Sequence, residues 1–222
     1  MPDFLLPAAT ALALGALHSL APDHLTAVSA IVSRRPGWRR AMGLGARWGV
    51  GHSAAVVAVG GLLVLAGLRL PARFTPLAEC AVGVTLIVLG ALTLARAMRV
   101  HGHWHEHDGE RHWHLHSHAA RETHDHSHGA LLGIGLLHGL AGSGAVLVLI
   151  PSALSGSAAG SLLFLGAFAL GTIAAMSVCA AVAGAFMSAA ARYSTSLHRG
   201  AMVLAGVASG AVGVWWLTLL GA

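Results

Sequence analysis

The sequence predicts an all-α polytopic membrane protein, and three observations support this fold class. Of the 222 residues, 56% are hydrophobic and 9% are charged, whereas a soluble domain carries about 25% charged residues. The apolar residues form runs of about 20 or more, which is the length that crosses a bilayer about 30 Å thick. The basic residues are all arginine and lie mostly between these runs, where they set topology. We therefore expect an integral protein of the lipid bilayer, with no nucleic-acid partner.

Six transmembrane helices are expected from the apolar runs. They cover residues 4–32, 41–68, 76–98, 130–154, 159–188 and 199–220. The first run has no basic flank and contains polar residues, so we expect a retained span and not a cleaved signal peptide. Arginines concentrate in the loops after the first, third and fifth spans, and the positive-inside rule places these loops in the cytoplasm. Both termini are then expected outside, in a protein of the cytoplasmic (inner) membrane.

An internal repeat relates residues 1–99 to residues 129–222 at an offset of 120 positions. His18 matches His138, and Gly51 matches Gly171. Because each half contains three spans, the two halves must cross the membrane in opposite directions. Inverted repeats are typical of secondary transporters, whose sites lie near the midplane where the halves meet. We expect a single membrane domain built from two inverted three-helix repeats.

Four histidines and one carboxylate lie deep within the expected spans. They are His18, Asp23, His24, His52 and His138. A carboxylate at the bilayer centre costs about 2.5–3.5 kcal/mol, which a metal ion, a proton or an arginine partner could offset. Imidazole with carboxylate suits nickel, cobalt, zinc or iron(II) better than magnesium or calcium. We therefore predict that these five residues bind metal, with secondary or backbone contributions from Ser53 and Ser143; the alternative for Asp23 is a structural, hydrogen-bonded carboxylate.

Helix breaks are expected at the same depth in both halves. In a regular helix, which turns about 100° per residue, His18, Asp23 and His24 could not all face one ion. Pro22 removes the backbone hydrogen bond to the carbonyl of His18. The matching residues of the second half, Gly142, Ser143 and Gly144, include poor helix formers. The alternative is a merely kinked helix in which only two of the three residues bind metal.

The loop of residues 100–128 is rich in histidine. It contains His101, His103, His105, His107, His112, His114, His116, His118, His124, His126 and His128. This composition is typical of metal binding, and the lack of a fixed zinc-finger spacing predicts a disordered segment with weak or multiple sites. We expect a cytoplasmic loop that buffers, senses or hands on metal and that the transport step does not require. The alternative is a solvated linker.

The His-x4-Asp-His spacing of His18, Asp23 and His24 resembles the hallmark of the nickel/cobalt transporter superfamily. The sequence Gly51, His52 and Ser53 in the next span is also similar. The His-rich loop and the following LLHGLAGSGA resemble the small six-span, urease-accessory (UreH-like) branch. The resemblance implies Ni²⁺ or Co²⁺ as the substrate, and a cytoplasmic metallochaperone or metalloenzyme maturation protein as a partner. The chain matches the uptake type at Asp23 and departs from it at Ala21, where uptake permeases usually have another aspartate.

The leading hypothesis is a divalent-metal transporter that is not an enzyme. It takes up nickel or cobalt, with Zn²⁺ or Fe²⁺ as further substrates, and is driven by an ion gradient or the membrane potential because no phosphate-binding loop motif is present. The alternatives are efflux through the same site and a metal-sensing or accessory protein that binds through the loop. A remote alternative is a rhomboid-like intramembrane serine protease at Ser143, although Ala141 replaces the expected glycine and the last span has no internal histidine as base.

Overall fold

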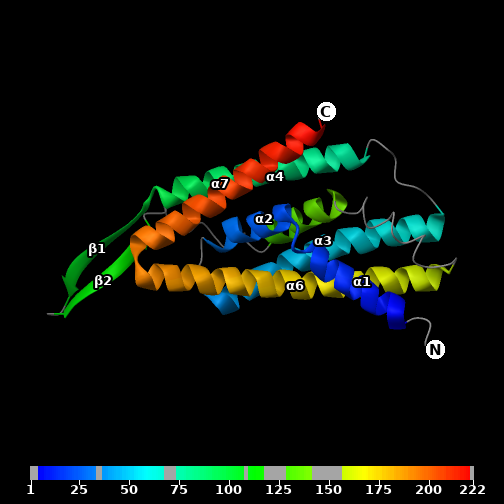
Figure 1. The fold of residues 1–222 in the computed structure, drawn as a ribbon, viewed down its shortest axis with the longest axis horizontal. Coiled ribbons are helices and arrows are strands. Elements are labelled where there is room, and N and C mark those ends of the chain that lie inside the picture. The colour runs from blue at the N-terminus through cyan, green and yellow to red at the C-terminus, as the bar shows by residue number, and fades with distance from the viewer. Residues whose placement is uncertain are drawn as a thin grey trace.

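The computed structural model describes residues 5–33, 37–67, 74–107, 110–117, 129–141 and 157–220. Their elements run along one long axis, and a hairpin projects at one end (Figure 1). In chain order they are α1 (Leu5–His18), α2 (Pro22–Val32), α3 (Trp38–Ala66), α4 (Phe74–Ala97), β1 (Val100–His107), β2 (Glu110–Ser117), the helix Gly129–Ala141, α6 (Ala158–Tyr193) and α7 (Thr195–Leu220).

Four of the described helices are long and apolar enough to cross a membrane: α3, α4, α6 and α7. The bent pair α1 and α2 makes a fifth candidate if it is counted as one span. This number of apolar helices identifies an integral membrane protein. The count of six stays a prediction, because only Gly129–Ala141 of the expected fourth span lies within the described residues.

The helix break expected near Pro22 is confirmed. α1 ends at His18, α2 begins at Pro22, and the two axes differ by 59°. The connecting turn is closed by hydrogen bonds from Leu20 N to Leu17 O and from Ala21 N to His18 O, both 3.0 Å. Proline is well placed as the first helical residue, because the amide hydrogen it lacks would have no partner there. The second expected break, at Gly142, Ser143 and Gly144, lies outside the described residues.

Small residues let the helices approach at the level of their backbones. On α3, Gly45 lies against Met176 of α6, Gly49 against Ile173, and the Ser53 hydroxyl donates to the Ala169 carbonyl at 3.3 Å. Positions on α6 fall as those on α3 rise, so these two helices are antiparallel. Such close packing is typical of membrane helices, which associate through van der Waals contact and interhelical hydrogen bonds.

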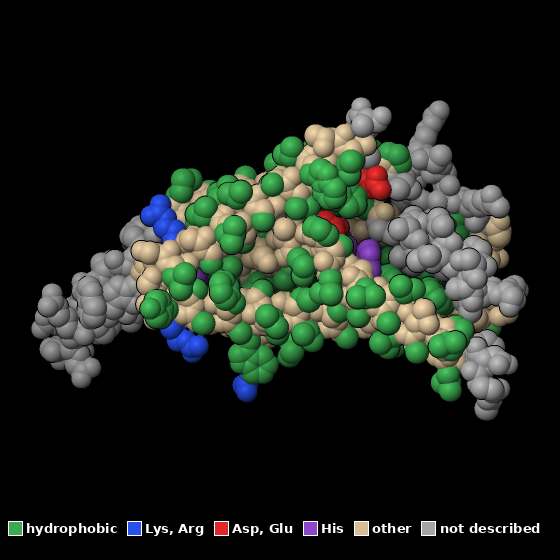
Figure 2. All heavy atoms as spheres, viewed as in Figure 1, with side chains coloured by type: hydrophobic (Ala, Val, Ile, Leu, Met, Phe, Trp, Pro, Cys, Tyr) green, Lys and Arg blue, Asp and Glu red, His purple; other side chains and the backbone are tan. Residues whose placement is uncertain are grey.

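Arginines gather at one end of the bundle, which we call the arginine end (Figure 2). It is formed where α3 and α7 begin and where α4 and α6 finish. Its described arginines are Arg39, Arg40, Arg96, Arg99, Arg192 and Arg199. β1 follows α4 directly, so the hairpin projects from the same end (Figure 1).

The His-rich segment differs from the disorder expected for it. β1 and β2 pair antiparallel, with His101 opposite His116, His103 opposite His114, and His105 opposite His112. Histidine recurs at every second position in both strands, and this period matches the alternation of a strand. The dipeptide between the strands, Asp108-Gly109, is one that hairpin connections favour. Composition alone hid this pattern, and residues 118–128 lie outside the described part of the chain.

Candidate metal centre

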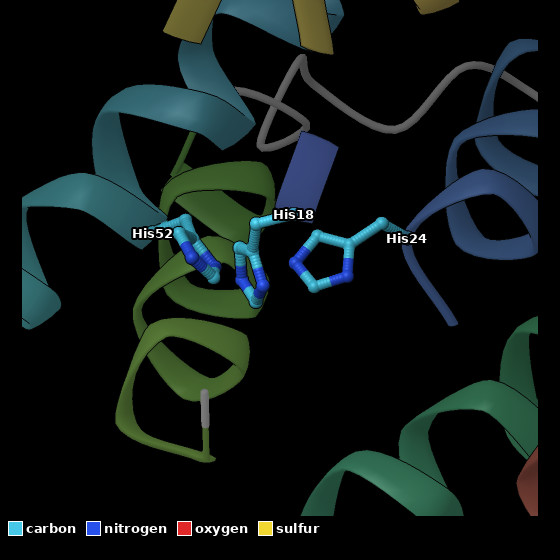
Figure 3. Close-up of side chains that lie close together, drawn as sticks. All are labelled: His18, His24 and His52. Carbon is cyan, nitrogen blue, oxygen red and sulfur yellow. The ribbon is translucent and has the colours of Figure 1, made fainter. Parts of the chain in front are cut away.

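Three histidines from three different elements converge inside the bundle (Figure 3). His18 is the last residue of α1, His24 lies in the first turn of α2, and His52 lies in the middle of α3. One ring nitrogen from each can be chosen so that all three lie within 4.8 Å of one another. Nitrogens bound to one tetrahedral ion at about 2.0–2.1 Å are about 3.4 Å apart, so small side-chain movements bring these three onto a single cation.

The break at Pro22 produces this convergence. It turns the axis of α2 by 59° from that of α1, and the rings of His18 and His24 lie 4.7 Å apart between centroids. His52 reaches both rings from the neighbouring helix, at 5.3 Å from His18 and 5.0 Å from His24. A continuous helix would point His18 and His24 in different directions. The proline is therefore what turns two separated histidines into one site.

Asp23 lies beside this cluster, against one of its histidines. Its Oδ2 atom is 2.9 Å from Nδ1 of His24. Histidines that bind metal commonly present their second ring nitrogen to a carboxylate, which fixes the ring and raises its basicity. The place of Asp23 in the structure suits a carboxylate that supports His24, and its role as a direct metal ligand stays a prediction.

His138 lies at the edge of the cluster. Its ring centroid is 5.8 Å from that of His24, and its Nδ1 lies 3.1 Å from the backbone oxygen of Ile134. Donation from Nδ1 to that carbonyl leaves Nε2 with a free lone pair. His138 comes from the helix Gly129–Ala141, and thus joins the second half of the chain to the centre.

Most polar groups of this centre are removed from solvent, whereas the His18 side chain is half-buried. His24, His52 and His138 are at most 2% exposed, and Asp23 is 6% exposed. Within the described residues, Nε2 of His18, His24 and His138 and both ring nitrogens of His52 have no hydrogen-bond partner. A buried polar atom without a partner costs about 1–3 kcal/mol. A cation that accepts these lone pairs would remove that cost.

The other predicted site residues are not part of this cluster. The Ser53 hydroxyl is engaged with the Ala169 carbonyl and joins α3 to α6. Ser143 lies outside the described residues, as do His118, His124, His126 and His128. The remaining loop histidines belong to β1 and β2.

Sequence reasoning missed two aromatic residues at this centre. Trp48 of α3 lies 5.5 Å from His24 and 5.3 Å from His138 between ring centroids. Phe168 of α6 lies 5.5 Å from His18. A signal for both was present, because 48 and 168 differ by the same 120 positions that relate His18 to His138.

Comparison with known proteins places the chain in a family. The family described as "Cytochrome C biogenesis protein transmembrane region" matches residues 25–210. The chain belongs to this family. His52 and His138 lie within the matched residues, whereas His18, Asp23 and His24 come just before them.

A curated relative extends the comparison to almost the whole chain. Urease accessory protein UreH from Bacillus sp. (strain TB-90) is 28% identical over 209 residues, which are 94% of this chain and 89% of the relative. No solved structure matches the chain. The alignment thus covers nearly the full length of both proteins.

Proposed function

We propose that this protein carries a divalent transition-metal ion across the membrane, as a member of the nickel/cobalt transporter superfamily. The observation that carries the proposal is the convergence of His18, His24 and His52, with buried and unpartnered ring nitrogens, in the interior of a bundle of membrane helices. Nitrogen donors with a nearby carboxylate favour Ni²⁺ or Co²⁺ as the substrate, with Zn²⁺ and Fe²⁺ as weaker alternatives. The similarity to a urease accessory protein supports an accessory role of this kind for the chain.

Uptake is the proposed direction, with the arginine end in the cytoplasm of a cell whose inner membrane holds the protein. Positive charge at one end of the bundle supports this orientation. A divalent cation that moves toward a negative interior gains about 4.6 kcal/mol per 100 mV. Release would then occur beside the hairpin, where a metallochaperone or a maturation protein could receive the ion.

Two inverted repeats are the proposed plan of the membrane domain, and paired helix contacts support this plan. Gly15 packs on the backbone of Phe168, and Gly135, 120 positions later, packs on the backbone of Trp48, 120 positions earlier. The contact of Gly171 with Leu12 is likewise repeated by Gly51 with Leu132. Each contact thus recurs with the halves exchanged, as expected for repeats that meet around a central site.

The decisive experiment is metal flux in sealed proteoliposomes with Ni²⁺, Co²⁺, Zn²⁺, Fe²⁺ and Mn²⁺. We expect Ni²⁺ or Co²⁺ to move. Asp23→Asn is expected to slow this flux by about 10–100-fold, which is the usual effect of losing a carboxylate behind a metal-binding histidine. Deletion of residues 101–128 is expected to leave the flux in place.

Two controls frame this result. His198→Ala changes a buried histidine of α7 that is outside the three-histidine cluster, and it should transport normally. Normal flux by both His18→Ala and Asp23→Asn would refute transport through this centre. Absence of flux, together with metal binding that depends only on the loop, would favour a sensing or accessory protein instead.

We also propose that the hairpin buffers metal beside the arginine end, through histidines paired across its strands. His101, His103 and His105 lie two residues apart on β1 and therefore share one face. Their partners in register, His116, His114 and His112, lie on that same face of β2. Each of these three cross-strand pairs, which we call rungs, thus brings two histidine positions together in the sheet.

Paired substitutions test this register. In the full-length protein, we expect His103→Gln with His114→Gln to remove one rung, and the bound metal to fall by about one equivalent of the three that three rungs provide. His103→Gln with His112→Gln removes the same number of histidines but breaks two rungs, so the loss should be twice as large. Equilibrium dialysis at saturating Ni²⁺ measures both. Equal losses would show that only the number of histidines matters.

A further inference from the structure

Trp48 lies against the histidine cluster on the side of the arginine end. It precedes His52 by one turn of α3, and α3 begins at the arginine end. Its side chain is 1% exposed and contacts the rings of His24 and His138. No described residue accepts a hydrogen bond from its indole nitrogen. The ring thus lies against the centre on the side that faces that end of the bundle.

Phe168 occupies the corresponding place on the other side. Ser53 of α3 is level with Ala169 of α6, and Gly49 is level with Ile173. Phe168 is therefore level with the turn of α3 that follows His52, away from the arginine end. Side chains on a helix tilt toward its N-terminus, so the rings of Trp48 and Phe168 lean in opposite directions along these antiparallel helices.

The two aromatic residues make the same contact in the two halves of the chain. Trp48 contacts His138 at 5.3 Å, and Phe168 contacts His18 at 5.5 Å. Trp48 corresponds to Phe168, and His18 corresponds to His138, at the same offset of 120 positions. The cluster is thus bracketed by one buried aromatic ring from each half, and Phe168 is 3% exposed.

A small cavity adjoins Trp48. Its volume is about 10 Å³, about the least that holds one water molecule, and apolar residues of α2, α3, the helix Gly129–Ala141 and α6 line it. Among these are Leu44 and Gly45, which lie one turn closer to the arginine end than Trp48. The side of the indole that faces the arginine end therefore adjoins a space of about one water molecule.

We propose that Trp48 and Phe168 are the two gates of the metal site. Trp48 closes the site toward the arginine end, and Phe168 closes it toward the opposite end. A hydrated or bare cation cannot cross a close-packed aromatic ring, so each ring must move before the ion can pass on that side. Because each ring rests on a histidine of the centre, a cation that draws the imidazoles together also changes the support of both rings. Alternating movement of the two rings then gives alternating access.

This proposal rests on the proposed passage of metal through the cluster, but it can be tested without metal. The reporter is His52→Cys in a chain whose native cysteines are replaced by Cys80→Ser and Cys179→Ser. A membrane-impermeant cationic thiosulfonate is applied to either side of sealed, oriented vesicles in the presence of chelator, and the rate of thiol labelling is measured. Failure of metal flux in the native chain would refute the proposed function, whereas the labelling result judges the gates alone.

We expect Trp48→Ala to accelerate labelling only from the arginine end, and Phe168→Ala only from the opposite end. The expected gain is about ten-fold or more, because minor open states are typically populated at about 0.1–10%. Trp48→Phe keeps a ring in place and should retain the slow rate.

Phe164→Ala is the matched control for lost ring volume. Phe164 lies one turn from Phe168 on the same helix and is 2% exposed. It makes no ring contact with the histidines of the described centre, and its replacement should leave labelling slow from both sides. The proposal would be overturned if either gate variant were labelled faster from both sides or from the wrong side. Faster labelling of Phe164→Ala, or unchanged rates in both gate variants, would also overturn it.

Discussion

His52→Ala is expected to reduce the metal affinity of the membrane centre by more than about 100-fold, beyond the usual effect of losing a supporting carboxylate. His52 contributes the donor from α3, whereas His18 and His24 both come from the broken first span. It is fully buried, and both its ring nitrogens lack partners in the described structure. Its removal leaves two imidazoles and an unfilled space at the point of closest approach. Titration calorimetry with Ni²⁺ on the purified protein lacking residues 101–128 measures the loss without the background of the loop.

His198→Ala provides the comparison for this measurement. His198 is also a buried histidine, 3% exposed, but it lies in the first turn of α7 and outside the cluster. The affinity for Ni²⁺ should stay unchanged in that variant. An equal loss in both variants would mean that general destabilisation, and not the removal of a ligand, explains the result for His52→Ala.

Local chemistry explains why much of the centre could be predicted from the sequence. Pro22 cannot continue the hydrogen bonding of α1, and its position between His18 and His24 made a break, and hence convergence, foreseeable. His52 could be assigned because a histidine deep in an apolar run needs a partner. In both cases, one residue type has a strong physical consequence that does not depend on the rest of the fold.

Other features depend on distances between side chains in the fold, which the spacing of residues in the sequence does not give. The placement of Asp23 against His24, and not on the far side of the turn, follows from the 59° bend and the start of α2 at Pro22. Trp48 and Phe168 are aromatic residues within apolar runs, so their residue types do not distinguish them from core residues. Only their contacts with His138 and His18 show that they belong to the centre.

The hairpin illustrates a different limit. The abundance of histidine in residues 100–128 led to an interpretation from composition, which predicted disorder. The alternation of histidine along Val100–His107 and Glu110–Ser117 was visible in the same residues. Composition and periodicity gave opposite answers here, and the backbone follows the periodicity.

The second large effect is expected from Gly139→Ala, which should destabilise the protein by about 1–3 kcal/mol, the usual cost of overpacking. A Cβ atom at this position would overlap the backbone oxygen of His52 and approach the Ala55 Cβ to 2.9 Å. Backbone atoms cannot rotate away, so the helix Gly129–Ala141 must move off α3. Because Gly139 follows His138, this movement also separates His138 from His24. Thermal unfolding in detergent and Ni²⁺ titration should therefore both report a loss.

Gly133→Ala separates the contact from the backbone preference of glycine. Gly133 lies on the same helix, but a Cβ atom there would meet nothing within 4 Å in the described structure. Alanine is favoured over glycine in a helix by about 0.8–1.0 kcal/mol, so this variant should unfold at a higher temperature and bind Ni²⁺ as before. The two variants carry the same chemical change, six residues apart on one helix. Opposite shifts in their unfolding temperatures would locate the effect in the contact between Gly139 and His52. Stabilisation by both substitutions would instead show that this helix does not pack on α3 at the level of the metal centre.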